Sequence, residues 1–177
     1  PSPKERLGLT TKTGEKEVLL RKQNSYFLYL LPSPSGKFIA YYRDNHWYIY
    51  DIVHKKHTNV TQQINTRFFG KYEILQGDFA YGNAGWSKND NELILYDQYD
   101  LWAIKADGSS FRRLTHGREK QIAFRIATRS YFEPYTTNFD GLKSNTINLE
   151  EDLILQAKGF DEKTGYFKWN NHTGEKP

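Results

Sequence analysis

The chain has 177 residues, of which 25 are Lys or Arg and 21 are Asp or Glu, so its formal net charge is +4. These charges alternate along the sequence without a long basic block, and no nucleic-acid partner is expected. The absence of cysteine excludes disulfides and thiolate-bound zinc. Aromatic residues make up 16% of the chain and pack well on pleated strands, which predicts an all-β fold.

No apolar run approaches the roughly 20 residues that a membrane helix needs, so no membrane span is expected. The longest run, residues 26–31, has the length of a strand. No motif for a cofactor or a metal ion is found, and we assign neither to the chain.

The last six residues, HTGEKP at 172–177, look like the linker between successive two-Cys, two-His zinc fingers. Such a finger needs two thiolates, and the chain has none. The same Thr-Gly-Glu-Lys string occurs at 13–16, and both copies follow an apolar stretch, 7–9 in one case and 166–169 in the other. We therefore interpret the string as a glycine-containing hairpin turn.

A repeat organises the centre of the chain. Each unit reads as a polar turn, a strand, a short turn, a strand with a tryptophan, a third turn, and a strand ending in threonine. Three pairs of stretches hold this register at offsets of 54 or 55 residues: 33–42 with 87–96, 47–50 with 102–105, and 59–61 with 113–115. Four-stranded meanders repeated in this way are typical of β-propeller blades.

The predicted fold is an incomplete β-propeller fragment of about three four-stranded antiparallel blades. A propeller typically has 4 to 8 blades, so we expect the ring to be completed by blades outside this chain or the fragment to self-associate. In chain order the sequence predicts the end of a preceding blade at 1–20, a blade at 21–61, a loop insertion at 62–82, a blade at 83–128, a second loop insertion at 129–146, and a partial blade at 147–177.

Several motifs carry a family resemblance. SPSGKFIAY at 33–41 resembles repeats of TolB-like propellers and of prolyl oligopeptidase propellers. Together, YGNAGWS at 81–87, YDQYDLW at 96–102 and LTHGR at 114–118 resemble the N-terminal propeller of bacterial prolyl oligopeptidase-family serine peptidases, especially the Bacteroidetes type. The resemblance spans most of residues 7–169. It implies a periplasmic or secreted propeller that restricts peptide access to a Ser-Asp-His triad.

That triad belongs to an α/β-hydrolase domain, which this chain lacks. No Gly-x-Ser-x-Gly elbow occurs, and the stretch 85–89 lacks its second glycine, so Ser87 is interpreted as a turn residue and no catalytic residue is assigned. Dipeptidyl members of the family hold the substrate amino terminus with a glutamate pair, but Glu150 and Glu151 lie in a different context. The expected function is non-catalytic gating; the alternative is a TolB-like periplasmic propeller that acts as a protein-binding scaffold.

Two aspartates, Asp97 and Asp100, could form a cation site or could accept hydrogen bonds from backbone amides in a turn. Two carboxylates are too few for calcium, which favours the turn. Trp47 and Trp102, at matching repeat positions, are expected in the core between blades.

Recognition is expected in the two loop insertions, because loops on a rigid scaffold carry most binding residues. The candidate contacts to peptide or partner are Arg67 and Tyr72 in the first insertion, and Tyr131 and Tyr135 in the second. The five histidines lie mostly beside predicted turns, and none has a spaced partner that would define a metal site.

Overall fold

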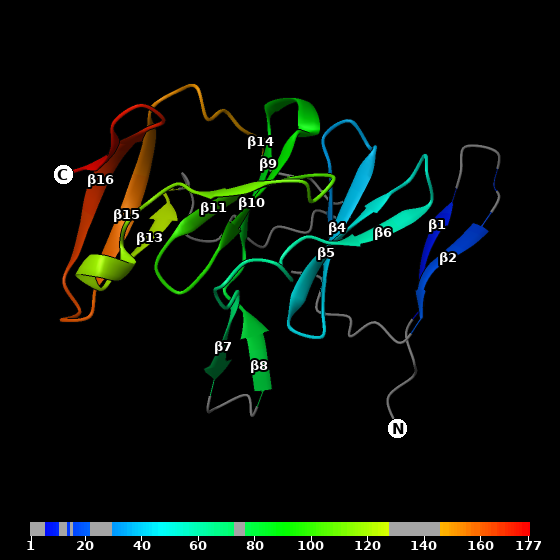
Figure 1. Ribbon diagram of the computed structural model, residues 1–177, viewed down its shortest axis with the longest axis horizontal. Helices are drawn as coiled ribbons and strands as arrows, with labels where there is room; N and C mark the ends of the chain where they lie inside the picture. The colour runs from blue at the N-terminus through cyan, green and yellow to red at the C-terminus, as the bar shows by residue number, and fades with distance from the viewer. Residues whose placement is uncertain (1–5, 11–13, 15, 22–29, 73–76, 128–145) are drawn as a thin grey trace.

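The computed structural model describes residues 6–10, 14, 16–21, 30–72, 77–127 and 146–177 (Figure 1). This part of the chain is all-β, as the sequence predicts, and its helical elements are two 3-10 turns, η3 (Lys88–Asp90) and η4 (Arg118–Lys120). Neither these turns nor any other described segment forms a helix long and apolar enough to cross a membrane.

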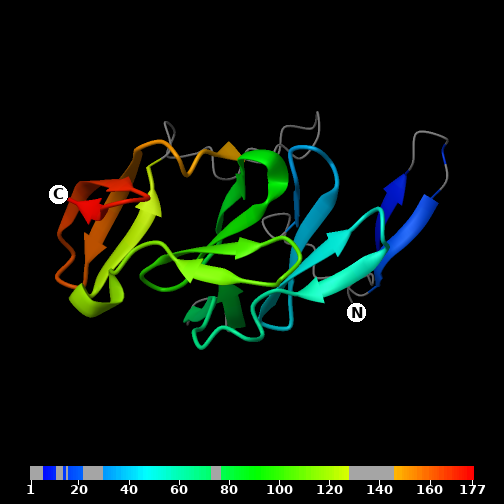
Figure 2. The same cartoon turned by 45° about the horizontal axis from the view of Figure 1, so that its top comes forward.

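Three antiparallel sheets lie side by side along the long axis of the molecule (Figures 1 and 2). The first has the order β3 (Leu30–Pro32), β4 (Phe38–Arg43), β5 (His46–Asp51), β6 (Lys56–Asn59). The middle sheet has the order β12 (Phe111–Arg113), β11 (Leu101–Lys105), β10 (Glu92–Tyr96), β9 (Asn83–Ser87), with β14 (Thr146–Ile147) added parallel to β9. The third has the order β13 (Ile122–Ile126), β15 (Leu153–Gly159), β16 (Thr164–Asn170), β17 (Gly174–Lys176).

An N-terminal hairpin of β1 (Arg6–Thr10) and β2 (Lys16–Arg21) confirms the strand pair expected there. Both copies of the repeated string place their glycine at positive φ, +84° at Gly14 and +69° at Gly174. Glycine adopts this conformation without steric cost, which explains why it occupies both positions. Gly14 lies in the β1–β2 connection, whereas Gly174 follows a turn and begins β17.

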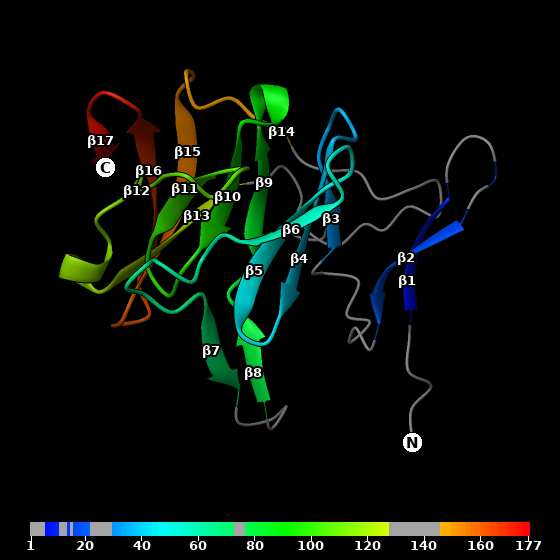
Figure 3. The same cartoon turned by 45° about the vertical axis from the view of Figure 1, so that its right-hand side comes forward.

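The first predicted insertion is more ordered than a loop. Within residues 62–82 the chain forms a hairpin of β7 (Phe69–Tyr72) and β8 (Gly77–Ala80), which extends beyond the first and middle sheets in Figures 1 and 3. Phe69 and Ala80 pack against the core between those sheets. The ring of Tyr81 covers Gly70 so closely that a Cβ atom there would lie 2.7 Å from the Tyr81 hydroxyl oxygen. These contacts stabilise a hairpin whose sequence lacks a clear turn signal.

The predicted boundary at residue 128 differs from the sheet boundary. β13 lies within the blade predicted at 83–128, but it pairs with β15, with Phe124 opposite Ala157. The ring of Phe124 also meets that of Phe167 in a T-shaped contact, with centroids 5.1 Å apart. The segment predicted as a partial blade at 147–177 is therefore completed to four strands by β13. Likewise, β14 begins at residue 146, inside the predicted second insertion.

The hydrophobic core is divided by the middle sheet. Leu93 and Leu95 of β10 point into a cluster shared with the first sheet, while Ile94 and Tyr96 point into a cluster shared with the third. This alternation follows from the two-residue period of a strand. All four side chains are buried, so the middle sheet is covered on both faces.

The repeat is visible as a recurring hydrogen-bond pattern. Ser33 Oγ accepts the N–H of Phe38 at 3.1 Å, and Ser87 Oγ accepts the N–H of Glu92 at 2.8 Å. Each serine closes the turn that precedes a central strand. The aligned serines of the two units therefore have the same structural role.

A second recurring pattern corrects one detail of the alignment. Thr61 Oγ1 accepts the N–H of Trp47 at 3.0 Å, and Thr115 Oγ1 accepts the N–H of Leu101 at 3.1 Å. Leu101, not Trp102, is thus the structural equivalent of Trp47. Trp47 and Leu101 are buried, whereas Trp102 is partly buried against the core between the first and middle sheets. Aligning Trp102 with Trp47 is wrong because the side chain of Trp102 lies on the other face of its strand from that of Leu101.

Candidate functional site

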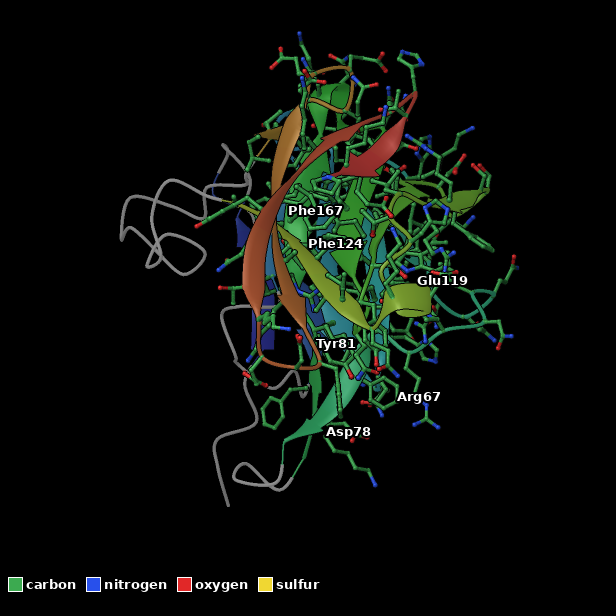
Figure 4. All side chains as sticks on the ribbon, turned by 90° about the vertical axis from the view of Figure 1, so that its left-hand side faces the viewer. Arg67, Asp78, Tyr81, Glu119, Phe124 and Phe167 are labelled. Atoms are coloured by element: carbon green, nitrogen blue, oxygen red, sulfur yellow. The ribbon has the colours of Figure 1, made fainter. Side chains whose placement is uncertain are left out.

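The candidate contact residues do not form one site in the described part of the chain. Arg67 is exposed just before β7, and Tyr72 ends β7, where its backbone pairs with Gly77. Figure 4 shows Arg67 toward the end of the molecule that carries this hairpin. The other two candidates, Tyr131 and Tyr135, lie outside the described residues.

Asp97 and Asp100 form the turn between β10 and β11. Asp97 Oδ1 accepts the N–H groups of Tyr99 at 2.8 Å and of Asp100 at 2.7 Å. An aspartate that binds amides two and three residues ahead is a common way to fix a tight turn. The turn interpretation of Asp97 is therefore confirmed.

The other oxygen of Asp97 joins three further segments. Oδ2 accepts hydrogen bonds from Arg118 Nη2 at 2.6 Å, Trp102 Nε1 at 3.0 Å and Thr66 Oγ1 at 3.1 Å. Arg118 Nη2 also donates to Thr66 Oγ1 at 2.8 Å. The carboxylate thus ties the first insertion, through Thr66, to the middle sheet and to η4. We call Asp97, Asp100, Thr66, Trp102 and Arg118 the carboxylate network.

Asp100 extends the carboxylate network toward the loop that follows β12. Its Oδ1 accepts the hydroxyl of Thr115 at 2.8 Å and the N–H of Gly117 at 2.6 Å, and Arg113 Nη1 lies 3.6 Å from its Oδ2. Both aspartates are fully buried. Buried carboxylates are tolerated only when such donors replace water.

The two buried carboxyls have opposite pKa shifts. Burial alone would raise the pKa of Asp97, but the N–H groups of Asp100 and Tyr99, the Trp102 indole and the Arg118 guanidinium outweigh it and lower the pKa. Burial raises the pKa of Asp100, and the nearby negative charge of Asp97 raises it further. The hydrogen bonds from Gly117 and Thr115 lower this pKa but do not outweigh the increase. Asp97 is therefore the firmly ionised member of the pair.

The carboxylate network has the chemistry of a structural clamp. Its oxygens face N–H, hydroxyl and guanidinium donors, which do not leave the open carboxylate positions that a divalent cation needs. Among the described residues no group of three His, Cys, Asp or Glu side chains could hold a metal ion. Thr66 and Arg118 were not singled out from sequence, because they lie 52 residues apart and no local pattern relates them.

Ser87 has the turn role expected from sequence. It is buried, and its Oγ is engaged by the N–H of Glu92 at 2.8 Å. Three residues later, Asp90 Oδ2 accepts the hydroxyl of Ser33 at 2.7 Å and the N–H of Ser35 at 3.0 Å. The turn before β10 is thus fixed to the equivalent turn of the first sheet and does not present a nucleophile.

The histidines and glutamates considered from sequence have separate partners; His116 Nδ1, for example, lies 3.6 Å from Glu175 Oε2 of the third sheet. His46 Nδ1 lies 3.1 Å from Thr61 Oγ1, and His57 Nδ1 lies 2.9 Å from the Tyr41 hydroxyl. Glu151 accepts a hydrogen bond from Asn148 at 2.7 Å within an exposed turn. These contacts do not bring the histidines and Glu151 together into one site.

Comparison with known proteins does not identify the chain. No protein-family model, no curated protein and no solved structure matches it.

Proposed function

We propose that this chain is the non-catalytic β-propeller portion of a prolyl oligopeptidase-like serine peptidase, which limits peptide access to a hydrolase domain of the parent protein. The observation that supports the proposal is a hydrogen bond that recurs in adjacent sheets. Thr61 accepts the backbone N–H of Trp47 in the first sheet, and Thr115, 54 residues later, accepts that of Leu101 in the middle sheet. The stretches at 33–41 and 96–102 that resemble this family lie in those two sheets.

The packing of successive sheets supports the same proposal. Trp86 of the middle sheet donates its Nε1–H to the carbonyl of Leu31 in the first sheet at 3.2 Å. Trp169 of the third sheet donates to the carbonyl of Leu114, just after the middle sheet, at 2.7 Å. A chain of sheets that each contact only their neighbours is what consecutive propeller blades require.

A gating role needs a recognition element held in a fixed position. The carboxylate network fixes Thr66, and one residue later Arg67 is exposed at the start of the β7–β8 hairpin. We propose that this hairpin, with Arg67 and Tyr72, contacts the peptides that the parent enzyme admits. The periplasmic or secreted location belongs to the same proposal and would be checked by cell fractionation.

The test uses an active-site probe on the native protein. Antibodies against residues 146–177 would isolate the native protein from its source, and a fluorophosphonate would label any activated serine covalently. We expect labelling of a serine outside residues 1–177, and no labelling or peptide cleavage by the purified 177-residue chain. Native protein that remains unlabelled, with a reading frame that encodes blades alone, would overturn the gating proposal and leave a binding scaffold.

A further inference from the structure

A hollow of about 490 Å³ opens at one end of the third sheet, between η4 with the start of β13 and the end of the β15–β16 hairpin. This volume lies within the range of small-ligand sites, roughly 300–1,000 Å³. Its lining includes Lys120, Ile122, Ala157, Phe160, Gly165 and Phe167.

The hollow arises from the strand register. Ala157 lies directly opposite Gly165, and the next inward position, Gly159, lies opposite Ile122. Small residues therefore meet at this end of the inward face, whereas Leu155 pairs with Phe167 further along and fills the space. A Cβ atom built on Gly165 would meet no atom within 4 Å. The space exists because small residues coincide on two adjacent strands: Ala157 and Gly159 on β15 and Gly165 on β16.

The lining combines an apolar floor with one uncompensated positive charge. Ile122, Ala157 and Phe167 supply the floor, and Phe160 stands at the rim with 82% of its surface exposed. Its exposed ring gives the rim of the hollow an apolar surface next to the apolar floor. Lys163 is paired with Asp161 at 2.7 Å, but Lys120 has no carboxylate partner within the described part of the chain.

We propose that this hollow binds an apolar group that carries a carboxylate. The apolar group lies between Phe160 and the apolar floor, over Gly165, and the carboxylate lies on Lys120. Two sources share this chemistry: a free aryl or branched-chain carboxylic acid, and the C-terminal residue of a peptide. The assignment rests on the hollow and its charge, and it does not require that the parent be a peptidase.

The first experiment is a titration of the full 177-residue chain with N-acetyl-L-phenylalanine, followed by amide NMR. A fragment of this size reaches a Kd on the order of 1 mM. We expect saturable shifts confined to the amides around Gly159, Gly165 and Lys120. The matched probe N-acetyl-L-phenylalaninamide lacks the carboxylate and should bind about tenfold more weakly.

Two variants separate the apolar and the charged contacts. Gly165→Leu fills the hollow, and it is expected to abolish the shifts caused by both probes. Lys120→Gln removes the charge at an exposed position and should weaken binding of the acid about tenfold while leaving that of the amide unchanged. Lys56→Gln makes the same charge change on β6 of the first sheet and should leave both affinities as in the wild-type chain.

The source of the carboxylate is decided by comparing the free acid with the tetrapeptide Ala-Ala-Ala-Phe and its C-terminal amide. Tighter binding of the tetrapeptide than of N-acetyl-L-phenylalanine identifies a peptide terminus, and the reverse order identifies a free acid. The proposal is overturned if none of these acids shifts the Gly159 and Gly165 amides at 10-fold excess over the expected Kd. It is also overturned if Lys120→Gln binds the acid as well as the wild-type chain does, a comparison that does not depend on the folding of Gly165→Leu.

Discussion

Trp169 and Leu114 connect the third sheet to the middle sheet through one buried hydrogen bond, in which the indole Nε1–H donates to the carbonyl oxygen at 2.7 Å. Trp169 is 2% exposed, and its ring belongs to the core between the two sheets. The same side chain therefore fills the interface and satisfies a backbone carbonyl that water cannot reach.

Trp169→Phe should destabilise the chain by about 2–4 kcal/mol, since it leaves the Leu114 carbonyl without its donor and shrinks a buried ring. Urea unfolding would measure the change. Tyr166→Phe is the control, because Tyr166 lies on the same strand with 67% of its surface exposed. It should change stability by less than about 0.5 kcal/mol, and equal effects of the two variants would contradict the role of the indole hydrogen bond.

Asp97→Asn tests the clamp on the first insertion. The amide oxygen can still accept the N–H groups of Tyr99 and Asp100, but the amide NH₂ cannot accept from Arg118, Trp102 or Thr66. We expect a loss of about 3 kcal/mol and faster amide exchange at residues 64–72. Asp107→Asn is the matched control, since Asp107 is exposed and accepts the N–H of Ser109 in a similar turn. Unchanged exchange at residues 64–72 in Asp97→Asn would show that the network does not hold the insertion.

The two buried carboxyls should respond oppositely to acid. The lowered pKa of Asp97 gives stability that is present above its ordinary value of 3.8 and is lost as the pH falls through the lower folded value. Because the pKa of Asp100 is raised in the folded chain, the folded chain binds a proton at this carboxyl at a higher pH than the unfolded chain does. Protonation of Asp100 therefore adds stability as the pH falls toward 3.8.

Urea unfolding between pH 7 and pH 3 would resolve this difference. Compared with the wild-type chain, Asp97→Asn should lose less stability below about pH 4, and Asp100→Asn should lose more on acidification. Parallel pH profiles for the three chains would show that neither carboxyl contributes to the acid response.

Tyr41 should ionise at a higher pH than an ordinary tyrosine. Burial raises its pKa to about 12, the nearby Tyr48 acts in the same direction, and Arg43 opposes the shift. The ring also stacks on Tyr48, with centroids 5.2 Å apart. Its contribution to stability is therefore complete below the ordinary value of 10.0 and is lost as the pH rises through about 12.

The absorbance difference at 295 nm between the wild-type chain and Tyr41→Phe isolates this one phenol. We expect the difference to appear near pH 12. A step near pH 10 would show that Tyr41 is accessible to water in the folded chain.

The sequence by itself determined the local features of this protein. Hairpins such as β15–β16, the turn at Asp97 and the matching roles of Ser33 and Ser87 follow from strand period and turn chemistry within a few residues. The 54-residue offset could be read directly, because each unit repeats its turn and strand residues in the same order. The all-β class follows from the same patterns.

Only the tertiary structure decided which segments meet. β13 joins β15 across the 26 residues 127–152. Thr66, in the first insertion, reaches Arg118 in η4. Strand pairing and buried charge are satisfied by the partners that folding brings near, whatever their distance in the sequence. The hollow at Gly165 likewise depends on the register of three strands. Pairings of this kind are set by the collective packing of the core, and no single stretch of sequence contains the information that specifies them.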